Sequence, residues 1–352
     1  MAIVIVGGGA IGLLVLSRLA QAANLPSVAL LTRPNGAAAL RANPLVVSGI
    51  GTCELTNLTV AGAVTELPPA FQSPALAILC VKGYDTEGAI PTLRALNPAT
   101  ILTLQNGIGN EETLAAAFGA DRIVSGAITT SVDATGPTTI TVTKAGGIGL
   151  APVGAASDLT RAETALSAAG FAVRRYPDYR ALKWSKALLN MLGNATAAIL
   201  GWPVDQVYAN RRLIALERAA VREALAVMQA MGVKPVNLPR YPAALLAFGI
   251  RWLPPALLDP ILRQRVAGGR GGKDPSLLRD LRAGRTRSEG EFLYGAVVAA
   301  AAAHGLAAPV NAGLWQVLSG IARGELAWED YRGQPERLLA VCSATPPAHR
   351  RD

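Results

Sequence analysis

The sequence predicts an α/β protein with a mostly parallel, doubly wound sheet in its N-terminal half and a mostly α-helical C-terminal half. Three observations lead to this fold class. Residues 1–6 form a buried apolar strand that runs directly into a glycine-rich turn and an apolar helix. Strands and helices then alternate up to about residue 175, which is typical of a parallel sheet covered by helices. From Tyr179 onward the apolar residues recur almost entirely with the helical period.

The turn after the first strand carries Gly7, Gly9 and Gly12 with the spacing G-x-G-x-x-G. Gly7 permits the tight turn, Gly9 lets the backbone approach a pyrophosphate, and Gly12 lets the next helix pack closely on the strand. The free N–H groups where that helix begins, at Ala10 and Ile11, and the helix dipole favour an anion. The turn therefore predicts a dinucleotide-binding site.

The strand that follows this helix, over residues 27–32, indicates which dinucleotide binds. NAD-binding proteins usually carry an acidic residue at the end of this strand, about 20 residues past the glycines. Here no acidic residue occurs between Gly12 and Glu54, and the strand ends in Thr32-Arg33. A guanidinium suits the 2′-phosphate of NADP, so we expect NADP(H). The alternative is that Arg33 is only a solvated loop arginine.

Length and composition indicate two domains. A chain of 352 residues with 51% hydrophobic residues is long for one domain and can bury a large core. We expect a nucleotide-binding domain over 1–177, a helical substrate and catalytic domain over 178–340, and a tail over 341–352. The apolar N-terminus is explained as strand, turn and helix rather than as a leader peptide, so we expect a cytoplasmic protein.

Several classes of site are disfavoured by the residues that are scarce. Three scattered cysteines without a C-x-x-C pair indicate neither a disulfide framework nor a zinc site, and we expect no metal. Two histidines are too few for imidazole-based metal sites, and they argue against Ser-His-Asp hydrolysis.

Positive charge is concentrated in one part of the chain. Between Arg240 and Arg287 there are ten Lys or Arg and three Asp, and the basic residues are densest over 263–273. No aromatic residues are interleaved with these charges, which argues against a nucleic-acid site. The basic stretch is better explained as a cationic edge beside an anionic ligand, or as plain solvated surface.

Along the first half, polar residues follow two expected strands. Residues 75–81 and 100–104 read as buried strands, which end in Lys82 and in Gln105-Asn106. Ligands of doubly wound sheets bind beyond the carboxyl ends of the strands, so both Lys82 and Asn106 are candidate ligand contacts. We expect a loop-rich stretch over 34–69 with short β-prone runs such as 44–48, and β segments over 122–150 that extend the same sheet.

Along the second half, the expected helices span 181–200, 211–231, 241–266 with an interruption at Pro254-Pro255, 288–304 and 311–320. In the first of them Lys186, Asn190 and Asn194 recur every four residues and would share one helix face. Three polar side chains among Ala, Leu and Met need a polar ligand if that face is buried. The alternative is a solvent-facing stripe.

Six motifs in this order resemble the ketopantoate reductase (2-dehydropantoate 2-reductase) family, over residues 1 to about 320. They are Gly7-x-Gly9-x-x-Gly12, Cys80-Val-Lys82, Leu104-Gln-Asn-Gly-Ile-Gly109, Lys186-x3-Asn190-x3-Asn194, Pro275-Ser-Leu-Leu-Arg-Asp280 and Ser288-Glu-x-Glu291-x3-Gly295. The resemblance implies a Rossmann-type N-terminal domain and a helical C-terminal domain like that of 6-phosphogluconate dehydrogenase.

The resemblance also implies roles for individual residues. NADPH would deliver hydride to a 2-oxo acid, with Lys186 as general acid and Glu289 bonding the substrate hydroxyl and orienting Lys186. Substrate contacts would come from Asn106, Asn190, Asn194 and Ser276, and cofactor contacts from Gly7, Gly9, Ala10, Ile11, Gly12, Arg33, Lys82 and Asn106.

Where the family pattern has T-E-I-D-Y-x-N-G, this chain has Ser288-Glu-Gly-Glu-Phe-Leu-Tyr-Gly. The choice between Glu289 and Glu291 therefore stays open, with Glu289 favoured. The leading hypothesis is reduction of ketopantoate in pantothenate synthesis. The alternatives are reduction of another 2-oxo acid and NADPH sensing without turnover. We expect a small-molecule substrate, no nucleic-acid or membrane partner, and leave a homodimer open.

Overall fold

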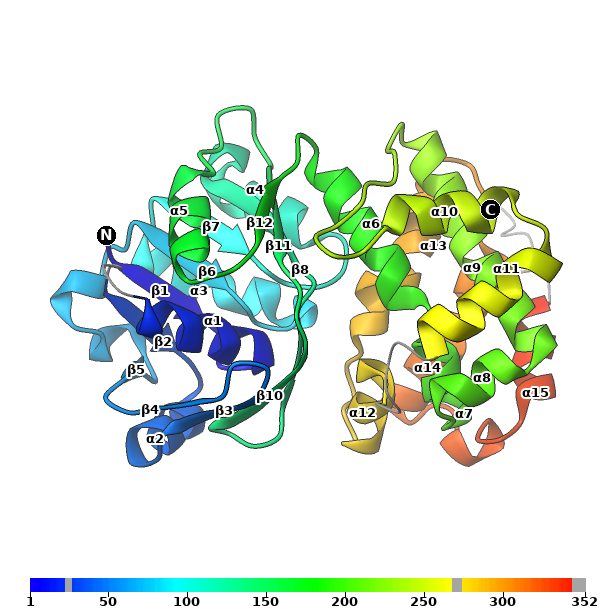
Figure 1. Cartoon of the computed structure of the whole chain (residues 1–352), viewed down its shortest axis with the longest axis horizontal. Coiled ribbons are helices and arrows are strands. Elements are labelled where there is room, and N and C mark those ends of the chain that lie inside the picture. Colours follow the sequence, from blue (N-terminus) through cyan, green and yellow to red (C-terminus); the bar gives the residue numbers. More distant parts are fainter. Residues whose placement is uncertain (23–26, 268–273, 344–352) are drawn as a thin grey trace, which may run out of the picture. The chain divides into compact units, whose positions relative to one another are not determined.

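The computed structural model describes residues 1–22, 27–267 and 274–343, which belong to two compact units (Figure 1). The first unit comprises Met1–Lys183 with Asn237–Tyr241, and the second comprises Trp184–Val236 with Pro242–Asp352. The division falls within helix α6 (Tyr179–Met191). A functional boundary at residue 177 stays a prediction.

The first unit is built on an eight-stranded sheet with the order β12-β11-β8-β7-β6-β1-β2-β5. Neighbouring strands run parallel, except for the antiparallel pair β8 and β11. The strands are β1 (Ile3–Val6), β2 (Val28–Leu31), β5 (Thr59–Ala61), β6 (Leu76–Leu79), β7 (Thr100–Thr103), β8 (Ile123–Ile128), β11 (Ile148–Pro152) and β12 (Val173–Arg175). The order reverses direction at β1, and this switch point is where doubly wound sheets bind ligands. The predicted fold class is confirmed.

Both faces of this sheet are buried, which explains its continuous apolar strands. Ile3 and Ile5 of β1 belong to one core cluster, whereas Val4 and Val6 belong to the other. Because side chains alternate along a strand, successive residues of β1 pack on opposite faces of the sheet. The helices of the unit are α1 (Ala10–Gln21), α2 (Pro34–Ala42), α3 (Thr86–Leu96), α4 (Asn110–Phe118) and α5 (Thr160–Ala168).

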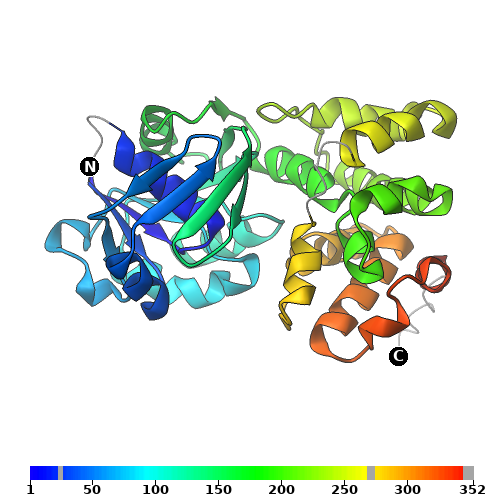
Figure 2. The ribbon, with the colours of Figure 1, turned by 60° about the horizontal axis from the view of Figure 1, so that its bottom comes forward.

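A second, four-stranded sheet corrects two expectations. Its order is β4-β3-β10-β9, with β3 (Leu45–Gly49), β4 (Cys53–Leu55), β9 (Ser131–Ala134) and β10 (Thr139–Lys144). Only β8 and β11 of the 122–150 segments extend the main sheet, because β10 pairs instead with β3, parallel to it (Figure 2). The stretch 34–69 is also less loop-rich than expected. It contains α2, which begins with Pro34 in its first turn, a recognised helix-start signal.

The second unit is helical. Besides the rest of α6 it contains α7 (Ala195–Leu200), α8 (Val204–Ala209), α9 (Arg211–Ala230), α10 (Ala243–Trp252), α11 (Pro255–Leu262), α12 (Ser276–Arg282), α13 (Tyr294–Ala303), α14 (Pro309–Arg323) and α15 (Pro335–Ser343). No helix in the described ranges is long and apolar enough to cross a membrane.

Two helical expectations were wrong in detail. The helix expected over 181–200 is broken between α6 and α7, where Gly193 has φ 62°. The helix expected from 288 starts as a 3₁₀ turn, Glu289–Phe292, and becomes α-helical only at Tyr294. Residues 341–343 of the expected tail belong to α15. The rest of the tail, and residues 268–273 of the basic glycine stretch, lie outside the described residues.

Candidate functional site

The three glycines of the turn after β1 have different roles: two are required by the fold, and the third leaves space beside the turn. Gly7 has φ 113°, and a Cβ added there would lie 2.8 Å from the Val81 backbone nitrogen. A Cβ on Gly12 would lie 1.9 Å from the Gly7 carbonyl oxygen. A Cβ on Gly9 would meet nothing within 4 Å. Gly7 and Gly12 therefore shape the turn, while Gly9 borders open space.

That open space lies where helix α1 begins. Gly9 is the N-cap of α1 and offers no side chain to the first-turn N–H groups, which include those of Ala10 and Ile11. Uncapped N–H groups and the positive end of a helix dipole attract an anion. The turn thus fits the pyrophosphate of a dinucleotide.

Arg33 stands at the carboxyl end of β2, as expected. Its side chain is 86% exposed, and its Nη2 lies 3.3 Å from Oδ2 of Asp85. An exposed ion pair of this kind contributes little to stability because water competes with both partners. The Arg33 guanidinium is therefore accessible to a phosphate, although Asp85 competes for it.

Lys82 and Asn106 follow the neighbouring strands β6 and β7, and the structure ties their two loops together. Gln105 donates from Nε2 to the Lys82 carbonyl oxygen at 3.3 Å and to Thr86 Oγ1 at 2.8 Å. Asn110 donates from Nδ2 to the Asn106 carbonyl oxygen at 3.1 Å. Both predicted residues are half-buried at the carboxyl edge of the sheet, the edge that also carries the glycine turn.

A buried ion pair supports the same loop and was not predicted. Lys183 Nζ lies 3.1 Å from Glu111 Oε1, with the two side chains 3% and 1% exposed. Lys183 also donates to the Gln105 carbonyl oxygen at 2.5 Å, and Ser125 donates to Glu111 at 2.7 Å. In the sequence, Glu111 looks like an ordinary acidic residue in the first turn of a helix. Nothing local in the sequence indicates that it meets Lys183.

In the second unit, Lys186 and Asn190 lie one turn apart on α6, and both are half-buried. Asn194 does not share their helix, because α6 ends at Met191 and Asn194 is the N-cap of α7. The expected single stripe was therefore wrong, since the break at Gly193 reorients the chain.

The structure nevertheless brings three of the predicted residues together. The side chain of Asn194 donates to the Asn190 carbonyl oxygen at 3.0 Å and to Ser276 Oγ at 3.4 Å. Its Oδ1 accepts the Leu277 N–H at 3.2 Å. The amide of Asn194 therefore connects the end of α6 to the start of α12.

Glu217 holds the break between α6 and α7 and was also missed. This buried carboxylate accepts the Gly193 N–H at 2.6 Å and the Thr196 hydroxyl at 2.5 Å, and the Tyr208 hydroxyl donates to it at 3.3 Å. A carboxylate with several donors is well compensated for its burial. These hydrogen bonds therefore stabilise the helix break, and the sequence gives no indication that Glu217 is buried beside it.

The two carboxylates of the 3₁₀ turn Glu289–Phe292 differ in their exposure to solvent. Glu289 is buried, at 8% exposure, whereas Glu291 is exposed. Ser288 caps this turn by accepting the Gly290 N–H at 3.1 Å. Burial of Glu289 agrees with the side favoured from the sequence, while its catalytic role stays a prediction.

Metal and thiol chemistry have little support in the described part of the chain. No cluster of three or more His, Cys, Asp or Glu side chains that could hold a metal occurs among the described residues. Burial raises the pKa of the Cys80 thiol far above its ordinary value, so this sulfur stays protonated at neutral pH.

Comparisons with known proteins agree with these features. Residues 3–154 match the family model of ketopantoate reductase PanE/ApbA, and residues 178–322 match its C-terminal model. A 2-dehydropantoate 2-reductase of Halobacterium salinarum is 30% identical, covering 75% of this chain and 80% of that protein. One of Pyrococcus horikoshii is 29% identical, covering 90% and 96%.

Solved structures show the same fold. A 2-dehydropantoate 2-reductase from Geobacter metallireducens aligns with a TM-score of 0.74 and 27% identity, covering 90% of this chain and 99% of that one. D-mandelate dehydrogenase with NADH and anilino(oxo)acetate aligns with a TM-score of 0.76 at 18% identity, covering 92% and 99%, a likeness of fold alone. With both halves matched by its family models, the chain belongs to the ketopantoate reductase PanE/ApbA family.

Proposed function

We propose that this protein reduces 2-dehydropantoate to pantoate with NADPH, a step of pantothenate and coenzyme A biosynthesis. The observation that carries the proposal is the pairing, in one chain of this family, of an open pyrophosphate turn with a half-buried lysine flanked by amides. The turn binds the nucleotide. A protein that only bound a nucleotide would not need the lysine and its neighbouring amides. Relatives named 2-dehydropantoate 2-reductase support the choice of substrate.

The first unit supplies the cofactor contacts. The pyrophosphate is held by main-chain N–H groups of the turn Gly7–Gly12, including those of Ala10 and Ile11. Gly9 leaves room for it. Arg33 meets the 2′-phosphate as a charge-assisted pair. Lys82 and Asn106 contact the bound cofactor from the ends of β6 and β7. Bound NADPH supplies the hydride.

Residues of the second unit carry the proton chemistry. Reduction of the ketone leaves negative charge on its oxygen, and the Lys186 ammonium both stabilises that charge and donates the proton from Nζ. Glu289 accepts a hydrogen bond from the 4-hydroxyl of the substrate and orients Lys186.

The amides beside Lys186 bind and align the substrate. Asn190 and Ser276 supply further contacts to it. Asn106 stays a predicted substrate contact. Asn194 acts partly through Asn190 and Ser276, since its own amide is bonded to both.

The test is NADPH oxidation measured against a panel of 2-oxo acids. We expect the highest kcat/KM with 2-dehydropantoate. We expect Glu289→Gln to lower kcat/KM for 2-dehydropantoate far more than for a 2-oxo acid without the 4-hydroxyl. The hydrogen bond to the 4-hydroxyl is lost only with the substrate that carries this group, whereas any effect through Lys186 is common to both substrates. Glu291→Gln is the matched control and should affect both substrates equally.

Other results would select the alternatives. Faster turnover of a different 2-oxo acid would replace the proposed substrate, and NADPH binding without turnover on any of them would indicate a sensor. A homodimer and a cytoplasmic location are further proposals that rest on the sequence alone.

A further inference from the structure

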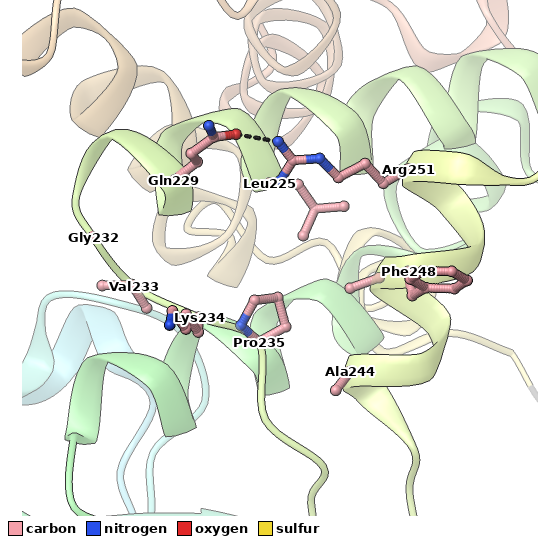
Figure 3. Close-up of a pocket in the computed structure, with 10 residues that line it drawn as sticks. Leu225, Gln229, Gly232, Val233, Lys234, Pro235, Ala244, Phe248 and Arg251 are labelled. Atoms are coloured by element: carbon pink, nitrogen blue, oxygen red, sulfur yellow. Dashed lines mark hydrogen bonds between the residues drawn. The ribbon is translucent and has the colours of Figure 1, made fainter.

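A hollow of about 400 Å³ lies in the second unit between the end of α9 and helix α10 (Figure 3). It is lined by none of the residues assigned to the reaction. Its walls are mainly apolar and include Leu225, Val233, Pro235, Ala244, Ala247 and Phe248. Its volume falls within the range of small-molecule sites, and such sites are typically apolar with a few polar groups that fix orientation.

Two of the three polar side chains that line this hollow are cationic. Lys234 and Arg251 line it, together with the amide of Gln229. Lys234 is exposed and has no hydrogen-bond or ion-pair partner among the described residues. Arg251 donates to Gln229 Oε1, a neutral acceptor, and lies over the Trp252 ring at 5.3 Å. Two positive charges therefore border the hollow without a carboxylate to neutralise them in the described structure.

The walls are held in place before any ligand arrives. Helix α9 ends in a left-handed Gly232 (φ 69°), after which the Val233 N–H donates to the Met228 carbonyl oxygen at 2.8 Å. The Val236 N–H donates to Oγ of the buried Ser185 on α6 at 2.8 Å. A cavity with fixed walls binds more tightly because little ordering is needed on association.

Helix α10 is fixed from the other side. Arg222 of α9 donates to the Ile250 carbonyl oxygen at 2.9 Å, which ties the two helices together. Phe248 is 57% exposed, so one aromatic face of the hollow remains in water. Covering that face with an apolar group is favourable by about 25 cal/mol per Å² of apolar surface removed from water.

We propose that this hollow is a second ligand site, separate from the reaction, which binds a small amphipathic anion. The apolar body of the ligand lies against Leu225, Ala244 and Phe248, and its carboxylate or phosphate pairs with Lys234 and Arg251. Binding needs both the two positive charges and the apolar wall. A neutral or cationic molecule of the same shape should therefore bind more weakly.

The test is calorimetric titration of the protein with octanoate, in the presence of saturating NADP⁺ and pantoate so that the sites assigned to the reaction are filled. We expect saturable binding of one octanoate per chain. We also expect 1-octanol and octylamine to bind at least about tenfold more weakly, because they lack the negative charge. No turnover is measured, so failure of the proposed reaction leaves this test intact.

Two variants locate the site and a third serves as control. Lys234→Gln combined with Arg251→Gln should weaken octanoate binding by about tenfold or more, and Ala244→Phe should abolish it by filling the hollow. Arg211→Gln, which removes an exposed cation at the opposite end of α9, should leave binding unchanged. Circular dichroism checks that each variant is folded.

Three results would overturn the proposal. The first is the absence of saturable octanoate binding to the unaltered protein. The second is equal binding to the unaltered protein and to a folded Ala244→Phe variant, which would place the anion elsewhere. The third is pairing of two chains, seen by sedimentation, that Ala244→Phe disrupts, because the hollow would then be a contact between copies.

Discussion

Lys183 and Glu111 form a buried ion pair of 3.1 Å, and Lys183 also binds the carbonyl oxygen of Gln105. The residue after Gln105 is Asn106, a predicted ligand contact. The pair therefore fixes the main chain of a loop at the ligand-binding edge of the sheet, although neither charged group is expected to touch substrate or cofactor.

Removing one partner of this pair should destabilise the protein strongly. Lys183→Met leaves the Glu111 charge buried and uncompensated, and we expect a loss of about 3–5 kcal/mol in the free energy of unfolding, measured with urea. The double variant Lys183→Met, Glu111→Leu should recover most of that loss. Arg323→Met, which breaks an exposed pair with Glu325, is the control and should cost at most about 1 kcal/mol. Equal effects of the two single substitutions would contradict a structural role for the buried pair.

The glycine turn offers a substitution that separates folding from cofactor binding. Gly9 has φ −81° and ψ −177°, which alanine adopts freely, and its Cβ would meet nothing in the protein. We expect Gly9→Ala to keep the melting temperature of the protein without ligand but to weaken NADPH binding by about tenfold or more.

Gly12→Ala is the matched comparison. Its Cβ would collide with the Gly7 carbonyl oxygen, so we expect a loss of about 2–4 kcal/mol in the free energy of unfolding. Unchanged NADPH affinity in Gly9→Ala, measured by fluorescence titration, would show that the pyrophosphate binds elsewhere.

Arg33 and Asp85 together should set the preference for NADPH over NADH. Arg33→Ala should remove most of the preference, because the charge-assisted contact with the 2′-phosphate is lost. Asp85→Asn should strengthen NADPH binding a few-fold, since it frees Arg33 from its competing partner. The dissociation constants of both cofactors check this, and equal affinity of the unaltered protein for NADPH and NADH would rule out the assignment.

Tyr179 should make stability fall at alkaline pH. Burial, with the nearby charge of Glu112 and the hydrogen bond donated to it, raises the pKa of Tyr179 from 10.0 to about 12. The unfolded chain therefore loses this proton first. The stabilising contribution is complete below about pH 10 and is lost as the pH rises from about 10 to 12.

The comparison is with Tyr179→Phe, which has no such proton. Its free energy of unfolding should decline less steeply above about pH 10 than that of the unaltered protein. Parallel declines would mean that the folded and unfolded states ionise Tyr179 alike.

Features that depend on local sequence were predictable. The glycine turn and the ends of β6 and β7 follow from the spacing of the glycines and from the ends of the apolar strands. The sequence also favours Glu289 over Glu291; Glu289 is buried, and which carboxylate acts on the substrate stays a prediction.

Features that depend on distant partners were not predictable. The pairing of β3 with β10 joins segments about ninety residues apart, and neither strand signals the other. The break after α6 depends on Glu217, which lies on a different helix. The periodicity of Lys186, Asn190 and Asn194 suggested one continuous helix because a single sequence shows spacing but not the acceptor that interrupts it.

Proton donation by Lys186 is tested by measuring both NADPH binding and turnover in Lys186→Ala. We predict an NADPH dissociation constant close to that of the unaltered protein and a kcat for 2-dehydropantoate lower by about 100- to 10,000-fold, the range for loss of a positioned general acid. Near-normal turnover in this variant would show that Lys186 does not supply the proton.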